Sequence, residues 1–256
     1  MPDILTLSDA EDPRLALYRD VKDRDLTGRE GLFMAEGKVV LERLFRSRLA
    51  ETVSVLTTPE RLAGLDVEDL DAPVYVVAQE VMDSVAGFPI HRGYLALGRY
   101  RTPDVSGLLG LPGRLRVLAL SALANVDNMG GLMRNAAAFG VDAVLLDRDC
   151  CDPLYRKAIR VSVGGVFKVP HYRVDDLAGV LKTHDVAAYA LSPSGKVTLD
   201  TLRPANRSAF LFGAEGPGLS DEILSACTSV RIDMHGGFDS LNVATTGGIV
   251  LYHMCR

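Results

Sequence analysis

A short apolar run leads directly into a glycine-rich loop in the segment LFGAEGPGL, residues 211–219. Residues 209–212 have the composition of a buried strand, and the loop that follows carries three glycines and one acid, Glu215. A loop of this kind offers free backbone N–H groups at the carboxyl edge of a parallel sheet, where α/β proteins bind ligands. The chain contains neither a P-loop nor a Gly-x-Gly-x-x-Gly loop, so an ordinary nucleotide-binding loop is not indicated. Taken alone, the segment is equally typical of a tight turn rich in glycine.

The surrounding sequence, from residue 116 to residue 256, alternates apolar strands with helical segments. We expect strands at 117–120, 143–146, 166–169, 186–191, 209–212 and 229–232, and helices at 130–139, 153–161, 220–226 and 241–255. Gly140 suits the C-terminal end of the first of these helices, and Pro153 suits the first turn of the second. Because apolar strands joined by helices are buried on both faces, the pattern predicts an α/β fold with a parallel sheet.

The first hundred residues carry a second, smaller α/β pattern. Strands are expected at 31–36, 52–56, 74–77 and 94–97, and a helix after Gly37 has Val40, Leu41 and Leu44 on one face. Proline and glycine are frequent between residues 100 and 114, which is typical of a linker. We therefore divide the chain into an N-terminal α/β domain at 1–100, a linker at 101–115 and a larger domain at 116–256.

A second glycine-containing segment, NVDNMGGLMRNAA at residues 125–137, follows a predicted strand and opens a predicted helix. Asn128 can cap that helix through its side chain. Arg134 lies about one helical turn beyond Gly130 and Gly131, which places its guanidinium over a small, glycine-lined surface. A capped helix with a solvated arginine explains the same residues without a function.

A third segment, FDSLNVATTGGI at residues 238–249, opens the last predicted helix. Ser240 suits the N-cap position, and Asn242 then lies in the first turn, where a polar group points towards a loop or a ligand. Thr246, Gly247 and Gly248 form a small-residue face on which another backbone can pack closely. A capped C-terminal helix weakened by glycine is the alternative explanation.

Charge and cysteine content narrow the functional classes. The net charge of −5 argues against a simple basic nucleic-acid binder but leaves open a local cluster of arginines. The four cysteines form no Cys-x-x-Cys pair and the five histidines lack a two-histidine helical spacing, so no metal site is expected. The chain has no apolar run of the ~20 residues that a membrane span needs. Residues 1–5 do not resemble a secretory signal, so we expect a cytoplasmic protein.

Taken together and in this order, the three segments resemble the motifs of the SpoU (TrmH-like) family of RNA ribose methyltransferases, within the knotted SPOUT superfamily. The family patterns are Asn-x-Gly-x-x-x-Arg, matched at 128–134, Gly-x-Glu-x-x-Gly, matched at 213–218, and Ser-Leu-Asn-Val, matched at 240–243. Residues 156–170 resemble the stretch between the first two motifs. Residues 33–37 resemble part of the substrate-binding domain that many members carry, so the resemblance covers nearly the whole chain.

The resemblance implies a parallel α/β sheet whose C-terminal segment threads a loop to form a trefoil knot, preceded by a small α/β substrate-binding domain. It also implies that the cofactor is S-adenosylmethionine and that its methyl group is transferred to a ribose 2′-hydroxyl of ribosomal or transfer RNA. By the same resemblance the cofactor would be held by Phe212, Gly213, Glu215, Gly216, Gly218, Ile232, Leu241, Asn242 and Ala244.

For catalysis the resemblance points to Arg134, with four other residues around it. An arginine stays protonated, with a pKa above ~12, so Arg134 would either stabilise the developing alkoxide or act together with a substrate phosphate. Asn128 would orient the ribose or Arg134, and Glu215 would fix Arg134 or a loop amide. Ser240 and Asn242 would hold the geometry of the site.

The N-terminal domain would contact RNA. Candidates for phosphate contacts are Arg14, Arg19, Lys22, Arg24, Arg29 and Lys38. Acids interleaved among them are also typical of a solvated surface. Because family members dimerise through the catalytic domain, a homodimer is expected.

The third motif departs from the family pattern, since residues 244–248 read Ala-Thr-Thr-Gly-Gly where a serine and alanines are usual. Two alternatives stay open, and the altered third motif supports the first of them. One is a non-catalytic knotted protein that binds RNA or a ligand, and the other is a SPOUT enzyme that methylates a base. The arginine of the first motif favours ribose chemistry over base methylation.

Overall fold

The structure is a computed structural model that describes residues 2–19, 26–28, 30–86, 93–236 and 238–255. Contacts divide the chain into two compact units, one of Met1–Arg101 with Leu154–Lys168 and one of Thr102–Pro153 with Val169–Arg256. Within the described ranges, no helix is both long and apolar enough to cross a membrane.

The N-terminal unit is built on a five-stranded sheet with the order β1-β4-β3-β5-β2. Its strands are β1 (Ile4–Leu7), β2 (Phe33–Glu36), β3 (Ala50–Thr57), β4 (Val74–Val77) and β5 (Tyr94–Tyr100). Strands β1, β4 and β3 are parallel, whereas β5 runs antiparallel to both of its neighbours. The helical segments are η1 (Pro13–Tyr18), α2 (Lys38–Phe45), α3 (Pro59–Leu62) and α4 (Gln79–Ala86). As predicted, α2 buries Val40, Leu41 and Leu44.

One segment of the C-terminal half of the sequence packs in the N-terminal unit. Leu154–Lys168 contains α7 (Arg156–Val161) and the 3-10 turn η2 (Gly165–Phe167). The Phe167 ring stacks on Phe33 with ring centroids 5.1 Å apart, and Ser47 Oγ donates a hydrogen bond to the Phe167 carbonyl at 2.8 Å. The sequence had placed this whole segment in the C-terminal domain, because nothing local to it indicates a partner so distant along the chain.

The C-terminal unit has a seven-stranded sheet with the order β10-β12-β9-β11-β6-β7-β8. Its strands are β6 (Leu115–Leu120), β7 (Ala143–Leu146), β8 (His171–Arg173), β9 (Ala187–Leu191), β10 (Val197–Thr198), β11 (Arg207–Phe212) and β12 (Thr228–Arg231). Every neighbouring pair is parallel, so the predicted α/β fold with a parallel sheet is confirmed. The helical segments are α5 (Val105–Leu109), α6 (Val126–Phe139), α8 (Leu177–Thr183), η3 (Leu199–Thr201), α9 (Asp221–Ala226) and α10 (Val243–Met254).

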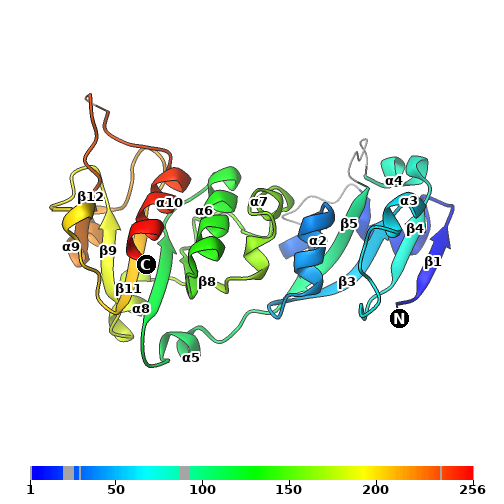
Figure 1. The fold of residues 1–256 in the computed structure, drawn as a ribbon, viewed down its shortest axis with the longest axis horizontal. Coiled ribbons are helices and arrows are strands. Elements are labelled where there is room, and N and C mark those ends of the chain that lie inside the picture. The colour runs from blue at the N-terminus through cyan, green and yellow to red at the C-terminus, as the bar shows by residue number, and fades with distance from the viewer. Residues whose placement is uncertain (1, 20–25, 29, 87–92, 237, 256) are drawn as a thin grey trace. The chain divides into compact units, whose positions relative to one another are not determined.

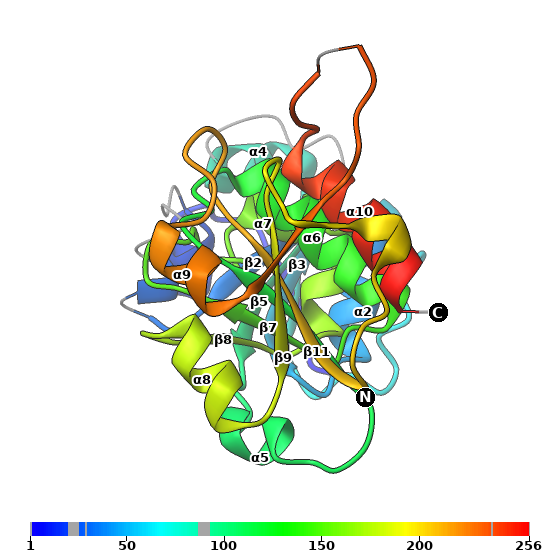
Figure 2. The same cartoon turned by 90° about the vertical axis from the view of Figure 1, so that its left-hand side faces the viewer.

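Successive side chains of a strand point to opposite faces of a sheet, so apolar strands need cover on both faces. Helices cover both faces of this sheet. On one face Val117 and Leu211 share a buried cluster with Leu109 of α5 and Leu181 of α8, against which Ile223 of α9 packs. Helices α6 and α10 lie side by side on the other face (Figures 1 and 2). The stretch predicted as a linker, residues 101–115, thus contributes α5 to the core of this unit.

Small residues allow α6 and α10 to approach closely (Figure 2). A Cβ added at Gly131 would lie 2.7 Å from Ala244 Cβ, and one added at Gly247 would lie 2.3 Å from Leu132 Cδ2. To make this contact the chain leaves β12, passes β9 and β11 in the sheet order, and returns to the helix that follows β6. The trefoil knot itself stays a prediction of the family resemblance.

Several predicted elements differ from the structure in their bounds. The helix expected at 130–139 begins at Val126. Residues 166–169 were expected as a strand, but η2 occupies this stretch and the strand is His171–Arg173, beyond Pro170, where it pairs with β7. The helix expected at 153–161 begins only at Arg156, so Pro153 precedes its first turn.

Candidate active site

A cavity of about 520 Å³ opens at the carboxyl edge of the seven-stranded sheet. Its walls come from the segments that follow β9, β11 and β12 and from the start of α10. Carboxyl edges of parallel strands are where open α/β sheets bind ligands. The position of the cavity therefore agrees with the expectation drawn from the glycine-rich loop.

Eight of the nine residues predicted to hold the cofactor line this cavity. They are Phe212, Gly213, Glu215, Gly216, Gly218, Ile232, Leu241 and Asn242. The ninth, Ala244, is not part of the lining. Its N–H donates to Asn242 Oδ1 at 2.9 Å and its Cβ faces Gly131.

Sequence reasoning missed the wall that follows β9, which is formed by Leu191, Ser192 and Pro193. The signal was present, since residues 186–191 were predicted as a strand of a parallel sheet and the next residues must lie at its carboxyl edge. The same reasoning would have added Met234, which follows β12 and also lines the cavity.

Side chains from all three motifs meet beside this cavity. Asn128 Nδ2 donates to Glu215 Oε1 at 2.6 Å, and Asn242 Nδ2 donates to Asn128 Oδ1 at 2.9 Å and to Glu215 Oε1 at 3.3 Å. Asn128 is 5% exposed, so its side-chain amide is shielded from water and needs hydrogen-bond partners within the protein. Glu215, predicted to fix Arg134 or a loop amide, accepts from the side-chain amides of Asn128 and of Asn242, which lies just before α10.

Both predicted helix caps are wrong by a few residues. Helix α6 is capped by Asn125, whose Oδ1 accepts from the amides of Asp127 and Asn128, rather than by Asn128 itself. Helix α10 is capped by Asn242, whose Oδ1 accepts from Ala244 and Thr245, rather than by Ser240.

These cap positions leave the two motif asparagines with different tasks. Asn128 lies in the first turn of α6 and is free of capping, so both ends of its amide serve the contacts with Glu215 and Asn242. Asn242 uses its oxygen for the cap and its nitrogen for the junction. One residue therefore fixes the start of α10 and joins it to the other two motifs.

The glycine-rich loop after β11 needs glycine for two physical reasons. Gly216 and Gly218 have φ of +90° and +73°, which residues with a side chain rarely adopt. At Gly213 an added Cβ would lie 2.2 Å from the Gly218 backbone carbon, so the loop folds back tightly on itself. The glycines thus set the shape of this wall and leave its backbone groups facing the cavity.

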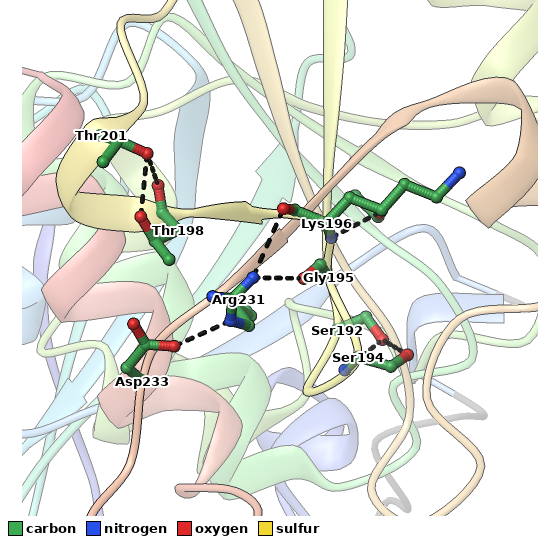
Figure 3. A network of polar contacts seen from close by, with 9 residues as sticks. Ser192, Ser194, Gly195, Lys196, Thr198, Thr201, Arg231 and Asp233 are labelled. Carbon is green, nitrogen blue, oxygen red and sulfur yellow. Dashed lines mark hydrogen bonds and ion pairs between the residues drawn. The ribbon is translucent and has the colours of Figure 1, made fainter.

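A polar network holds the wall that follows β9 against β12 (Figure 3). Arg231 Nη1 donates to the carbonyls of Gly195 and Lys196 at 3.0 and 3.4 Å, and its Nε donates to Asp233 Oδ1 at 2.8 Å. A Cβ at Gly195 would lie 2.3 Å from the Val230 backbone carbon. The segment 192–196 is therefore held in close backbone contact with the strand that lines the cavity.

The two remaining catalytic candidates lie outside the junction. Arg134 is exposed on α6 and, among the residues that the structure describes, has no hydrogen-bond or ion-pair partner. Ser240 is an exposed residue of the cavity lining, and its Oγ lies 3.4 Å from Asp239 Oδ1. An arginine without an internal partner keeps all of its donors for a ligand.

The cavity suits S-adenosylmethionine in its chemistry. Apolar side chains of Phe212, Ile232 and Leu241 offer contacts for a flat base, and Glu215 and Asp239 bring negative charge to the lining. A sulfonium is a cation, so acids in the wall favour it over a neutral analogue. The volume also lies within the ~300–1,000 Å³ range of small-molecule sites.

A parallel sheet whose carboxyl edge carries a cavity walled by a glycine-rich loop is the arrangement of an α/β ligand-binding protein. The family model of the SpoU rRNA Methylase family matches residues 116–252. The chain is 37% identical to an uncharacterized tRNA/rRNA methyltransferase of Mycobacterium bovis, over 99% of this chain and 92% of that protein. The chain therefore belongs to the SpoU rRNA Methylase family, and the predicted assignment to an S-adenosylmethionine-dependent RNA methyltransferase is confirmed.

Other relatives agree in sequence or in fold. The 23S rRNA (guanosine-2′-O-)-methyltransferase RlmB of Acinetobacter baylyi is 31% identical over 74% of this chain and 80% of its own length. The AdoMet-bound rRNA methyltransferase from Sinorhizobium meliloti superposes with a TM-score of 0.83 at 20% identity, over 98% of this chain and 97% of that one. This structural likeness extends to both units and shows the same fold.

Proposed function

We propose that this protein transfers the methyl group of S-adenosylmethionine to a ribose 2′-hydroxyl of ribosomal or transfer RNA. The observation that carries the proposal is the junction of Asn128, Glu215 and Asn242 beside the cavity, with the exposed Arg134 on the same helix as Asn128. The name of the RlmB relative, a guanosine-2′-O-methyltransferase, supports ribose chemistry and makes ribosomal RNA the first substrate to test.

The protein has two tasks in such a reaction, to position the attacking oxygen and to manage its proton. S-adenosylmethionine, when bound, would supply an electrophilic methyl group on its sulfonium, with a neutral thioether as the leaving group. Arg134 is permanently charged, so it stabilises negative charge on the ribose oxygen or pairs with a substrate phosphate that takes the proton. Asn128 and Glu215 hold the first turn of α6 against the glycine-rich loop, and Asn242 ties both to the start of α10.

RNA contacts are proposed for the N-terminal unit, but several of the predicted basic residues have acidic neighbours. Arg14 pairs with Asp12 at 2.6 Å, Arg19 pairs with Glu11, and Lys38 lies 3.7 Å from Glu42. Exposed pairs of this kind are worth little and exchange readily for phosphate. Lys22, Arg24 and Arg29 lie outside the described residues.

A homodimer through the methyltransferase unit is also proposed. Helix α10 leaves Ile249 and Tyr252 39% and 49% exposed, and Tyr252 makes an edge contact with Phe139 of α6. Neighbouring apolar side chains on two packed helices offer a surface that a second copy can cover.

Two alternatives lose support. A degenerate, non-catalytic protein was suggested only by the altered third motif, yet Asn242 makes both its cap and its junction contacts in this sequence. The arginine of the first motif favours ribose over base methylation. The test is to delete the gene, map lost 2′-O-methyl groups across all stable RNA, and restore them with purified protein. A lost base methyl group in place of a ribose one would overturn the proposal.

A further inference from the structure

The carboxylate of Asp147 lies directly after β7 and accepts hydrogen bonds from the connection between β6 and α6. Ser121 Oγ donates to Oδ2 at 2.7 Å, and the Ala122 N–H donates to the two oxygens at 3.0 and 2.9 Å. The amides of Asp149 and Cys150 donate to Oδ1 at 3.1 Å each. One side chain thus joins the turn after β7 to the segment that leads into the first-motif helix.

The turn that carries Asp147 is itself anchored. Arg173 Nη1 in β8 donates to the carbonyls of Asp147 and Cys150 at 3.0 Å each. Cys150 Sγ contacts the Leu120 carbonyl at 3.3 Å, and the Cys151 N–H donates to the Leu123 carbonyl at 2.9 Å. The carboxylate is therefore presented from a fixed platform across the ends of three neighbouring strands.

The residue that Asp147 holds has an unfavourable backbone conformation. Ala122 has φ of +53°, in the left-handed region that residues with a side chain rarely adopt without support from their surroundings. Only two residues separate Ala122 from Asn125, the cap of α6, and Asn128 follows in the first turn. A change of backbone conformation at Ala122 would therefore be transmitted directly to the start of α6.

We propose that Asp147 is a positioning residue for methyl transfer, which holds Ala122 in its left-handed conformation and thereby places Asn128 and Arg134. This inference rests on the proposed function. Asp147 is not part of the cavity lining, whose walls follow β9, β11 and β12. Burial alone would raise the pKa of the Asp147 carboxyl, but the hydrogen bonds from Ser121 and Ala122 lower its pKa overall, so the group is an ionised acceptor at neutral pH.

The test compares turnover with cofactor binding in Asp147→Asn, an isosteric change that replaces one acceptor oxygen by a donor and so opposes the Ala122 N–H. We expect kcat to fall by about 100-fold, the effect of a displacement of about 1 Å at a reacting group. Calorimetric affinity for S-adenosylmethionine should stay unchanged. Adding Ala122→Gly should restore much of kcat, because glycine adopts positive φ without help.

Two further variants separate positioning from general stability. Asp176→Asn makes the same substitution at the exposed cap of α8, where the Asn oxygen can still accept from the Gly179 N–H, and should leave kcat unchanged. Ser121→Ala removes one bond to Asp147 and should lower kcat in the same direction but less, which keeps the test valid if Asp147→Asn fails to fold. Unchanged kcat in both Asp147→Asn and Ser121→Ala, or no rescue by Ala122→Gly, would overturn the inference.

An inactive wild-type protein would refute the proposed function and not this inference. Hydrogen exchange measures how firmly the start of α6 is held, and it does not depend on enzymatic turnover. Amides of its first turn should exchange faster in Asp147→Asn than in wild-type protein, and equal rates would contradict the positioning role.

Discussion

The contact between α6 and α10 gives a quantitative prediction for Gly131→Ala. The new Cβ would lie 2.7 Å from Ala244 Cβ, whereas carbon atoms pack at about 3.5–4.0 Å. Neither Cβ can rotate away, so the helices must separate by roughly 1 Å at this point. Asn135 Nδ2, which donates to the Ala244 carbonyl at 2.7 Å, would then lose its bond.

Three contributions set the change in the free energy of unfolding that we expect for Gly131→Ala. Overpacking costs about 1–3 kcal/mol, and the lost hydrogen bond costs about 1 kcal/mol. Alanine is a better helix former than glycine by about 1 kcal/mol, which offsets part of this. We therefore expect a net loss of about 2 kcal/mol in the free energy of unfolding, or a Tm lower by roughly 4–8 °C for a chain of this size.

Thermal unfolding of three variants tests this reasoning. Gly247→Ala probes the same contact from α10, because its Cβ would lie 2.3 Å from Cδ2 of Leu132, which is buried and has little room to move, so this variant should also lower the Tm. Gly131→Ala combined with Ala244→Gly should regain most of the loss caused by Gly131→Ala. An unchanged Tm in both Gly131→Ala and Gly247→Ala would refute the close helix contact.

Three other predictions concern separate parts of the C-terminal unit. Gly195→Ala should force the segment 192–196 away from β12 and weaken S-adenosylmethionine binding by about ten-fold in calorimetry, equivalent to about 1.4 kcal/mol, and unchanged affinity would count against this wall. Burial lowers the pKa of His171 to about 3, so below about pH 6.5 the unfolded chain binds a proton that the folded protein does not, and stability declines as the pH falls from about 6.5 towards 3. His171→Gln should therefore show a shallower decline of the urea midpoint between pH 7 and pH 5 than wild-type protein, and identical slopes would contradict it. Ile249→Glu should convert a dimer into a monomer in light scattering, and a dimer that persists would move the interface elsewhere.

The sequence predicted the parallel sheet because apolar strands that alternate with helical segments are recognisable from local composition. Apolar strands and the breaks between them are properties of neighbouring residues, so their order could be read directly. The three motifs could also be placed at one edge, since each follows or precedes a predicted strand. What joins them, the bonds among Asn128, Glu215 and Asn242, spans up to 114 residues along the chain and has no local signal.

The errors in the predicted helix caps also arise from contacts between residues far apart in the sequence. Asn125 and Asn128 are both good capping residues, and only the distant Glu215 decides which of them is left for the junction. Likewise, the run at 166–169 is apolar enough for a strand, but Phe167 belongs to the N-terminal unit, where its ring stacks on Phe33. Tertiary contacts that lie far apart in sequence decided each of these details.

The most direct test of the central claim is mass spectrometry of nucleosides from RNA incubated with purified protein and S-adenosylmethionine, comparing wild-type protein with Arg134→Ala. We predict a 2′-O-methylated nucleoside with wild-type protein and none with the variant, whose calorimetric affinity for the cofactor is retained. Undiminished ribose methylation by Arg134→Ala would contradict the role given to this guanidinium, and a methyl group found on a base would contradict the proposed reaction.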